Sequence, residues 1–431
     1  MIRWIVRGIL RDKTRSLFPF LVVAVGVALV VVLLGFMEGI LMGMLDATAN
    51  LDTGHLRLVN KAFFEEEHLL PMDRALAAQR ETLAWLRKNS DPKIRWSPRI
   101  RWGAILDVPD ENGETVSQTP VTGLAIDLFS PDTPERTRLK LADSITRGRL
   151  PRQSKEMVIG YQLAETLGIE LEKTITLIGQ SFDGGLATDN YRVVGFIRFG
   201  VFIMDKKMAL IDLADAQDTF YMEDMVTDWL GFLPASVPVT DYEKYKTALA
   251  SRLKNWRHPE SWAADDEPVV LTILDQRGLG ALTNKFYVIR NVIVAIFVFL
   301  MVLVLWNAGL LNGIHRYGEM GLRLALGETH RHLLLSLLVE AFVIGVAGSV
   351  AGSVVGGGVV YYLQEVGIDM GDNFAQMGLM LSDVARGRLS VHGFIQGIVP
   401  GMTAGVLGTF IAALGIFNRS EANLFRELEV G

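Results

Sequence analysis

The chain has 431 residues, half of them hydrophobic, a formal net charge of −6 and no cysteine. The absence of cysteine excludes disulfides and thiolate metal sites, and the acidic balance argues against a nucleic-acid partner, for which a basic face is expected. No G-x-x-x-x-G-K-[ST] loop occurs, so the chain carries no P-loop ATPase of its own.

The first segments predict a membrane anchor. Residues 1–16 are basic, and Arg3, Arg7 and Arg11 recur every fourth residue opposite an apolar stripe. This pattern predicts an amphipathic helix on the cytoplasmic membrane surface, although an ordinary solvated helix end has the same pattern. Residues 17–43 then begin with an uncharged run of about 21 residues, long enough to span a bilayer and too long for the core of a cleaved signal peptide. We expect an uncleaved first transmembrane helix.

Residues 44–284 differ in composition and predict a large, mostly antiparallel α+β domain. Alternating apolar residues predict strands at 55–59, 101–108, 115–125 and 191–196, and helical spacing predicts helices at 74–88, 161–167 and 242–256. Asn112-Gly113 is typical of a hairpin turn between the second and third of these strands. The acidic runs 65–67 and 265–267 are expected to be solvated, and residues 180–190 to form a loop between strands.

The remaining chain alternates between apolar and polar segments. We expect transmembrane helices at 285–314, 333–363 and 393–418, an outer loop at 364–392 and a tail at 419–431. Basic residues gather in the two termini and in the short segment 315–332, which places these parts in the cytoplasm and the large domain outside. The predicted fold is therefore a membrane α-helical protein of four transmembrane helices, with an extracytoplasmic α+β domain inserted between helices 1 and 2.

Glycines recur every fourth residue in the last two spans. Small residues at this spacing let helices approach closely in lipid, so we predict helix packing, with direct substrate contact as the alternative. Pro400 is expected to kink or open the fourth span. The packing candidates are Gly348, Gly352, Gly356, Gly397, Gly401 and Gly405.

The seven histidines show no metal-ligand spacing such as H-E-x-x-H, and no G-x-S-x-G motif is present. The sequence therefore predicts neither a metal site nor a catalytic centre.

Segment 315–332 predicts a short amphipathic helix at about 317–326. Glu319 and Arg323 lie four residues apart on one face, Gly327 is a suitable stop, and Thr329 can cap the next helix. Such a helix either lies on the lipid surface or is bound by another protein.

The run from Arg316 to Gly327 resembles the R-x-x-E-I-G-x-R-x-A-L-G signature of the FtsX/MacB/LolC-LolE superfamily of ABC transporter permeases. Residues 147–179 and 191–217 are similar to the extracytoplasmic domain of LolC/LolE-type and MacB-type permeases, with Gly160 to Gly168 matching G-x-x-L-A-x-x-L-G. The resemblance implies that 315–332 is the coupling segment, which seats on a separate ATPase subunit. The implied coupling residues are Arg316, Tyr317, Glu319, Met320, Arg323, Leu326 and Gly327.

The resemblance further implies a permease of the bacterial inner membrane, a second permease copy or paralogue, and ATP and Mg²⁺ on the partner subunit. Three functions compete: LolC/LolE-like lipoprotein extraction, MacB-like efflux of peptides or drugs, and FtsX-like signalling to an outer enzyme. LolC-type permeases dock a lipoprotein carrier on a proline-bearing hook, and segment 180–190 contains no proline. The candidates for contact with lipidated cargo, which are equally suited to face plain lipid, are Phe36, Met37, Ile40, Met44, Phe297 and Met301.

Overall fold

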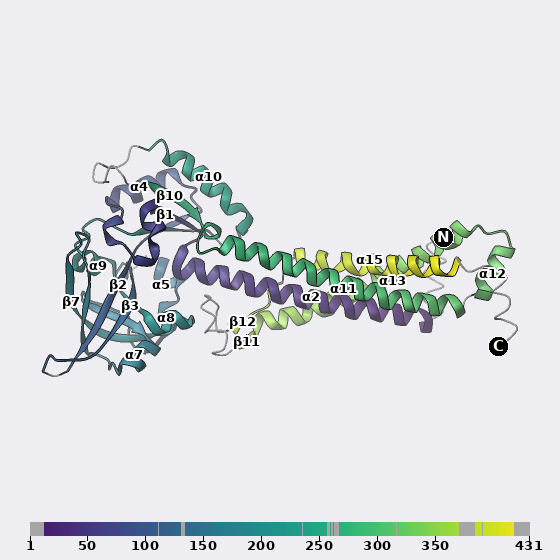
Figure 1. The fold of residues 1–431 in the computed structure, drawn as a ribbon, viewed down its shortest axis with the longest axis horizontal. Coiled ribbons are helices and arrows are strands. Elements are labelled where there is room, and N and C mark those ends of the chain that lie inside the picture. The colour runs from purple at the N-terminus through teal and green to yellow at the C-terminus, as the bar shows by residue number, and fades with distance from the viewer. Residues whose placement is uncertain are drawn as a thin grey trace. The chain divides into compact units, whose positions relative to one another are not determined.

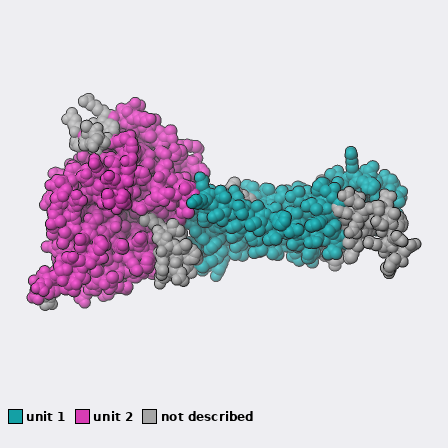
Figure 2. Space-filling view, viewed as in Figure 1, with its two compact units in different colours: residues 1–42, 284–369, 384–431 teal, residues 43–283, 370–383 magenta. Residues whose placement is uncertain are grey.

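The structure is a computed structural model that describes residues 13–417 apart from 111, 131–133, 235, 257–258, 260–261, 263–266, 316, 370–383 and 390. The predictions for residues 1–12 and 418–431 lie outside the described residues. The chain divides into two compact units, residues 1–42, 284–369 and 384–431 in one and residues 43–283 and 370–383 in the other (Figure 2). We call their described parts the helix bundle and the sheet domain.

Four long helices build the bundle (Figure 1). They are α2 (Lys13–Thr48), α11 (Leu279–His315), α13 (His330–Glu365) and α15 (Val391–Phe417), and the short α12 (Tyr317–Ala325) lies between α11 and α13 in the chain. Each long helix is long and apolar enough to cross a membrane. A shared core joins them, formed by Val23, Val27 and Val31 of α2, Met301 and Leu305 of α11, Val360 of α13 and Ala404 of α15. The predicted fold class is confirmed.

The helices extend beyond the predicted spans. Helix α2 continues to Thr48 and ends in a π-helical turn, η1 (Ala49–Thr53), while α11 already begins at Leu279. The charges at Glu38 and Arg290 bound the uncharged runs but do not end the helices, because a polar side chain beyond the hydrocarbon layer costs a helix little. The apolar pattern therefore identifies the part of each helix that lipid can cover, but it does not identify the residue at which the helix ends.

The strands of the sheet domain form one continuous ten-stranded sheet. The order is β10-β1-β9-β2-β3-β8-β5-β7-β4, and β6 pairs with both β2 and β7. Only β3–β8 and β5–β7 are parallel among the described pairings. The strands are β1 (Leu56–Asn60), β2 (Arg95–Pro109), β3 (Thr115–Ile126), β4 (Ile145–Gly148), β5 (Glu156–Gly160), β6 (Thr174–Gln180), β7 (Leu186–Ile197), β8 (Met208–Asp212), β9 (Asp228–Phe232) and β10 (Pro268–Thr272).

The sheet closes on itself through its longest strand. On one side β2 pairs first with β9 and then with β6, and on its other side it pairs with β3. Strands β2, β3, β8, β5, β7 and β6 therefore form a closed ring. On β2, the buried indole of Trp102 lies over its cross-strand partner Gly123, where any Cβ would fall 1.7 Å from the ring. Only glycine fits at that position.

Short helices accompany the strands. They are α3 (Lys61–Glu65), α4 (Gln79–Asn89), α5 (Pro134–Arg138), α6 (Leu141–Ser144), α7 (Tyr161–Leu167), α8 (Phe202–Lys207), α9 (Leu213–Thr219) and α10 (Tyr242–Leu253). The predicted helix at 161–167 agrees with α7, and that at 242–256 ends three residues earlier, at Leu253. The prediction for 74–88 is wrong in its first part, because Leu76 exchanges two backbone hydrogen bonds with Val226 and cannot stay helical.

The predicted loop at 180–190 is also wrong in extent. Residues 186–190 belong to β7 and pair with β6, as in the register of Thr188 with Ile178. The turn comprises only residues 181–185, where Gly184 takes a positive φ of 82°. The backbone pairing here overrides the polar composition of the segment.

Candidate functional site

Helix α12 and the residue that follows it carry two exposed leucines. Leu322 and Leu326 lie four residues apart, 63% and 79% exposed, whereas Met320 is 7% exposed. Residues four apart share one face of a helix, so the two leucines form an apolar strip. Arg316 lies outside the described residues, and so do the side chains of Tyr317 and Glu319.

The end of α12 is defined by its backbone. Gly327 has a φ of 93°, which a residue with a Cβ adopts only at a cost, and Glu328 N donates to Arg323 O at 3.1 Å. Thr329 Oγ1 then accepts from His332 N at 3.3 Å and caps α13. Between α12 and α13 only residues 326–329 are non-helical, so little free chain separates them.

The glycines of α13 lie against the backbone of α2. An added Cβ would approach Phe20 O to 3.0 Å from Gly348, Ala24 O to 2.3 Å from Gly352, and Ala28 O to 2.7 Å from Gly356. The contacts advance by four residues on both helices, which is the pattern of two helices in close contact along their length.

The glycines of α15 approach two helices. A Cβ on Gly397 would lie 2.4 Å from Val31 of α2, and one on Gly401 would lie 2.3 Å from the Ser349 hydroxyl of α13. One on Gly405 would meet Ala341 O of α13 at 3.4 Å. These glycines thus lie in close contact with α2 and α13. Pro400 lies inside α15, which continues through it.

The six candidates for contact with lipidated cargo differ in exposure. Met301 is buried in the bundle core against Gly26, and Met44 is buried in the sheet domain. Phe36, Met37, Ile40 and Phe297 are half-buried. In this structure, therefore, only these last four offer surface to a lipid chain.

The largest feature that the sequence did not predict is a cluster of buried charges in the sheet domain. Asp228 Oδ2 lies 2.9 Å from Arg57 Nη2 and 3.0 Å from Arg101 Nε, and both Asp228 and Arg57 have no exposed side-chain surface. Glu67 Oε1 lies 2.8 Å from Arg57 and 2.7 Å from Arg101. The expectation that residues 65–67 are solvated is therefore wrong for Glu67, because two strand arginines need its carboxylate.

The cluster continues to the end of α2. Arg101 donates to Asp52 Oδ1 at 2.7 Å, and Arg277 Nε lies 2.5 Å from Asp52 Oδ2. Beside it, Arg99 forms a bidentate pair with Glu135, at 3.0 and 2.9 Å. Although burial by itself lowers the pKa of Arg101, the carboxylates of Asp228, Asp52 and Glu67 raise it above its ordinary value. We call these residues the charge cluster: Asp52, Arg57, Glu67, Arg99, Arg101, Glu135, Asp228 and Arg277.

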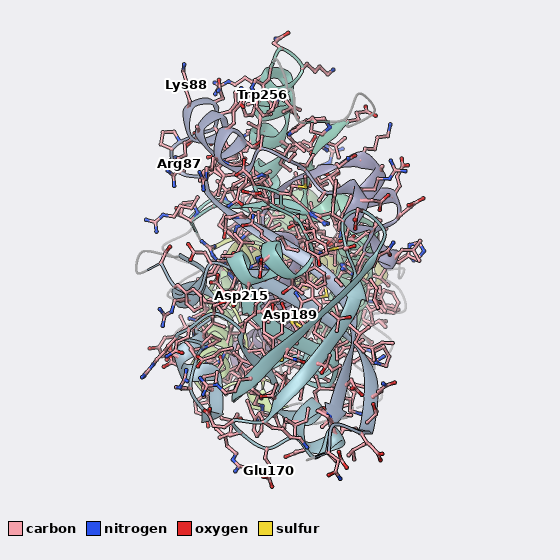
Figure 3. The ribbon with its side chains drawn as sticks, turned by 90° about the vertical axis from the view of Figure 1, so that its left-hand side faces the viewer. Arg87, Lys88, Glu170, Asp189, Asp215 and Trp256 are labelled. Carbon is pink, nitrogen blue, oxygen red and sulfur yellow. The ribbon has the colours of Figure 1, made fainter. Side chains whose placement is uncertain are left out.

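A separate clasp holds α9 to β7, where Figure 3 marks Asp189 and Asp215. Lys155 Nζ pairs with Asp189 and, at 2.9 Å, with Asp218, while Ser154 Oγ donates to Asp215. Burial lowers the pKa of Lys155, but the hydrogen bonds to Asp189 and Asp218 outweigh it and raise the pKa. A lysine held in its charged form is no nucleophile, so this group is structural.

His55 makes the sheet domain sensitive to acid. Burial, followed by the charge of Arg138, lowers the pKa of His55 to about 4, and its Nδ1 accepts a hydrogen bond from Leu233 N at 3.0 Å, which requires the neutral ring. The unfolded state thus binds a proton at higher pH than the folded state, and stability is complete above about pH 6.5. We expect it to fall by roughly 2–4 kcal/mol as the pH drops from 6.5 to 4.

Hydrogen exchange of the full chain, measured between pH 6.5 and 4, reports this change in the free energy of unfolding. His55→Asn keeps an acceptor without a titrating ring and should flatten the slope, while the exposed His68→Asn should not change it. An equal slope in the wild type and in His55→Asn would contradict the assignment.

Within the described residues, no three His, Asp or Glu side chains are grouped to hold a metal ion.

Comparisons with known proteins agree with this architecture. The family model of the MacB-like periplasmic core domain matches residues 16–240, and that of the FtsX-like permease C-terminal domain matches residues 291–420. No curated protein matches the chain.

Two solved structures are similar. The periplasmic region of MacB from Actinobacillus actinomycetemcomitans is 13% identical, with a TM-score of 0.33, over 52% of this chain and 90% of that one. The extracellular domain of the noncanonic ABC-type transporter YknZ from Gram-positive bacteria is 13% identical, with a TM-score of 0.31, over 46% of this chain and 92% of that one. The two family models together match most of the chain. These matches show that the chain belongs to the FtsX/MacB-type permeases of the ABC transporter superfamily, with a MacB-like periplasmic core domain.

Proposed function

We propose that this permease converts ATP hydrolysis by a separate subunit into movement of its sheet domain. FtsX-like permeases are not themselves ATPases, and an ABC-type permease implies an ATPase partner. On this proposal ATP and Mg²⁺ bind to the partner, and α12 is the segment that the partner grips. The exposed Leu322 and Leu326 support this role, because apolar side chains so placed at the end of a membrane bundle favour a partner surface.

One observation carries the proposal: α11 is a single uninterrupted helix. It runs for 37 residues from Leu279 to His315, and α12 begins at Tyr317. A helix of that length extends about 55 Å, well beyond the hydrocarbon core of a bilayer of about 30 Å. Within the described residues, a displacement applied at His315 is therefore carried along one continuous helix to Leu279, which belongs to the sheet domain.

The orientation follows from charge. Basic residues of the termini and of 315–332 favour the cytoplasm, so both termini and α12 are proposed to lie inside and the sheet domain outside, in a bacterial inner membrane. Four spans are few for a complete transport path, and we propose that a second permease, either a copy or a paralogue, completes the complex.

The proposed work is the extraction of lipoproteins or other lipophilic cargo from the membrane. The half-buried Phe36, Met37, Ile40 and Phe297 support it, since they leave apolar surface on α2 and α11. The MacB-like core domain favours efflux of peptides or drugs as the alternative, and the FtsX-like C-terminal domain favours signalling to an outer enzyme. The turn at 181–185 is short and lacks proline, which gives a periplasmic carrier no evident hook.

Leu326→Asp tests the coupling role of α12. Burying a leucine contributes about 1.5–3 kcal/mol, so its loss should weaken assembly with the ATPase roughly 10- to 100-fold. The ATPase that copurifies with the permease from native membranes is titrated against each variant in nanodiscs, and permease-dependent ATP hydrolysis is measured. Membrane insertion should be unchanged.

Arg331→Gln is the control, because Arg331 is also exposed but lies outside α12, in the first turn of α13. It should retain the wild-type titration. Normal stimulation by Leu326→Asp would remove α12 from the mechanism.

A further inference from the structure

Two of the chain segments that connect the sheet domain with the bundle meet at the charge cluster. Asp52 lies in η1, directly after α2, and Arg277 lies two residues before α11. Their side chains are joined at 2.5 Å. The two connections, separated by more than 200 residues of chain, are thus tied to each other within the sheet domain.

The end of α2 is also fastened to β2. Arg99 Nη1 donates to Leu51 O and Arg99 Nη2 to Asn50 O, both at 2.8 Å, and Arg101 holds the carboxylate of Asp52. Arginine donors on the last carbonyls of a helix satisfy groups that have no partner within the helix. Glu135 fixes the guanidinium of Arg99 from its other side, so this arginine has little freedom.

The segment before α11 is held in the same way. Arg57 of β1 donates to Gln276 Oε1 at 3.1 Å, and Gln276 Nε2 donates to Thr272 O at 3.0 Å. Arg277 and Gly278 both have a positive φ, of 49° and 68°. A left-handed arginine is costly and persists only where its surroundings hold it, as the ion pair with Asp52 does here.

The nature of these bonds matters for transmitting a displacement. The cluster contains four arginines and four carboxylates, so its formal charges cancel. Replacing such a network with packed apolar residues is often neutral for stability, so stability alone does not explain it. Bidentate and shared hydrogen bonds differ from apolar contacts in fixing direction, and so they oppose sliding and rotation of a helix end on a strand.

We infer that the charge cluster is a rigid joint through which α2 and α11 drive β1 and β2, with Arg99, Arg101 and Arg277 as positioning residues for coupling. The inference rests on the proposed function, and it adds the site at which helix motion becomes domain motion. An apolar or loose connection would let the helices move without the sheet.

Arg277→Ala tests the joint, and Arg192→Ala is a closely matched control. Arg277 is 47% exposed and shares Asp52 with Arg101, while Arg192 is 42% exposed and shares the buried Glu156 with Arg149. Each variant therefore removes a peripheral arginine and leaves its carboxylate one arginine partner. Arg277→Lys keeps the charge and should rescue.

The first readout is hydrogen exchange of the full chain in nanodiscs. Arg277→Ala should speed exchange about tenfold or more at residues 48–54 and 276–283, and Arg192→Ala should not. The second readout is the change in exchange along β1 and β2 when the copurified ATPase complex receives ATP and vanadate. Arg277→Ala should lose this change, while Arg192→Ala and Arg277→Lys should keep it.

Unchanged exchange at the helix ends of Arg277→Ala would overturn the rigid joint. Faster exchange at the helix ends of Arg277→Ala, together with an unchanged response of β1 and β2 to ATP and vanadate, would overturn the coupling role of the charge cluster. If the wild-type complex itself shows no nucleotide response in the sheet domain, the proposed function fails and the coupling role with it, and the wild-type arm distinguishes this outcome from the other two.

Discussion

Replacing Asp228 with alanine is expected to lower the free energy of unfolding of the sheet domain by about 3–5 kcal/mol. Asp228 is fully buried and its Oδ2 serves both Arg57 and Arg101, so its loss leaves two buried guanidinium groups short of a carboxylate. An uncompensated buried charge costs far more than a lost surface pair. Hydrogen exchange of the full chain at increasing denaturant measures the change in β1, β2 and β9.

Glu267→Ala provides the contrast in the same domain. Glu267 pairs with Lys61 at 2.9 Å, but their side chains are 65% and 48% exposed. Solvent screens such pairs, so the loss of this one should lower the free energy of unfolding far less than Asp228→Ala does. Similar losses in the free energy of unfolding for Asp228→Ala and Glu267→Ala would show that solvent screens the charge cluster as it screens a surface ion pair.

The second large effect is expected at Gly352. A leucine there would place its Cβ 2.3 Å from Ala24 O and 3.0 Å from Val27, and a backbone oxygen cannot turn away as a side chain can. Overpacking of this kind costs about 1–3 kcal/mol or more, which corresponds to a loss of roughly 6–12 °C in melting temperature at the upper value. Size-exclusion chromatography after heating in detergent measures it.

Gly358→Leu is the matched control on the same helix, because a Cβ at Gly358 meets nothing within 4 Å. It should keep the wild-type melting temperature and elution volume. Equal destabilisation by the two variants would attribute the effect to the loss of glycine itself and not to the contact with α2.

The elements that were predicted well have local signals. The four apolar helices, α7, and the β2–β3 hairpin at Asn112-Gly113 each depend on spacing within one short segment. The helix at 74–88 was misplaced because Leu76 is bound by Val226, 150 positions away. No window of local sequence contains that partner.

The charge cluster escaped prediction for the same reason. Its ion-pair partners lie far apart in sequence, as Asp52 does from Arg277 and Arg57 from Asp228. Glu67, in turn, lies in an acidic run that resembles a solvated loop. A signal was nevertheless present in β2, where Arg99 and Arg101 alternate with apolar residues. Two arginines on one face of a strand that packs into a core need carboxylates, so they call for a search for acidic partners.

The closed ring has a consequence for how such domains can share a crowded compartment. In the described sheet, the strand order ends at β10 and β4, which are five and four residues long. Long unpaired edges can pair with strands of other chains and so lead to aggregation, whereas short edges offer few backbone groups for such pairing. The ring itself therefore has no end strand at which a strand of another chain could continue it.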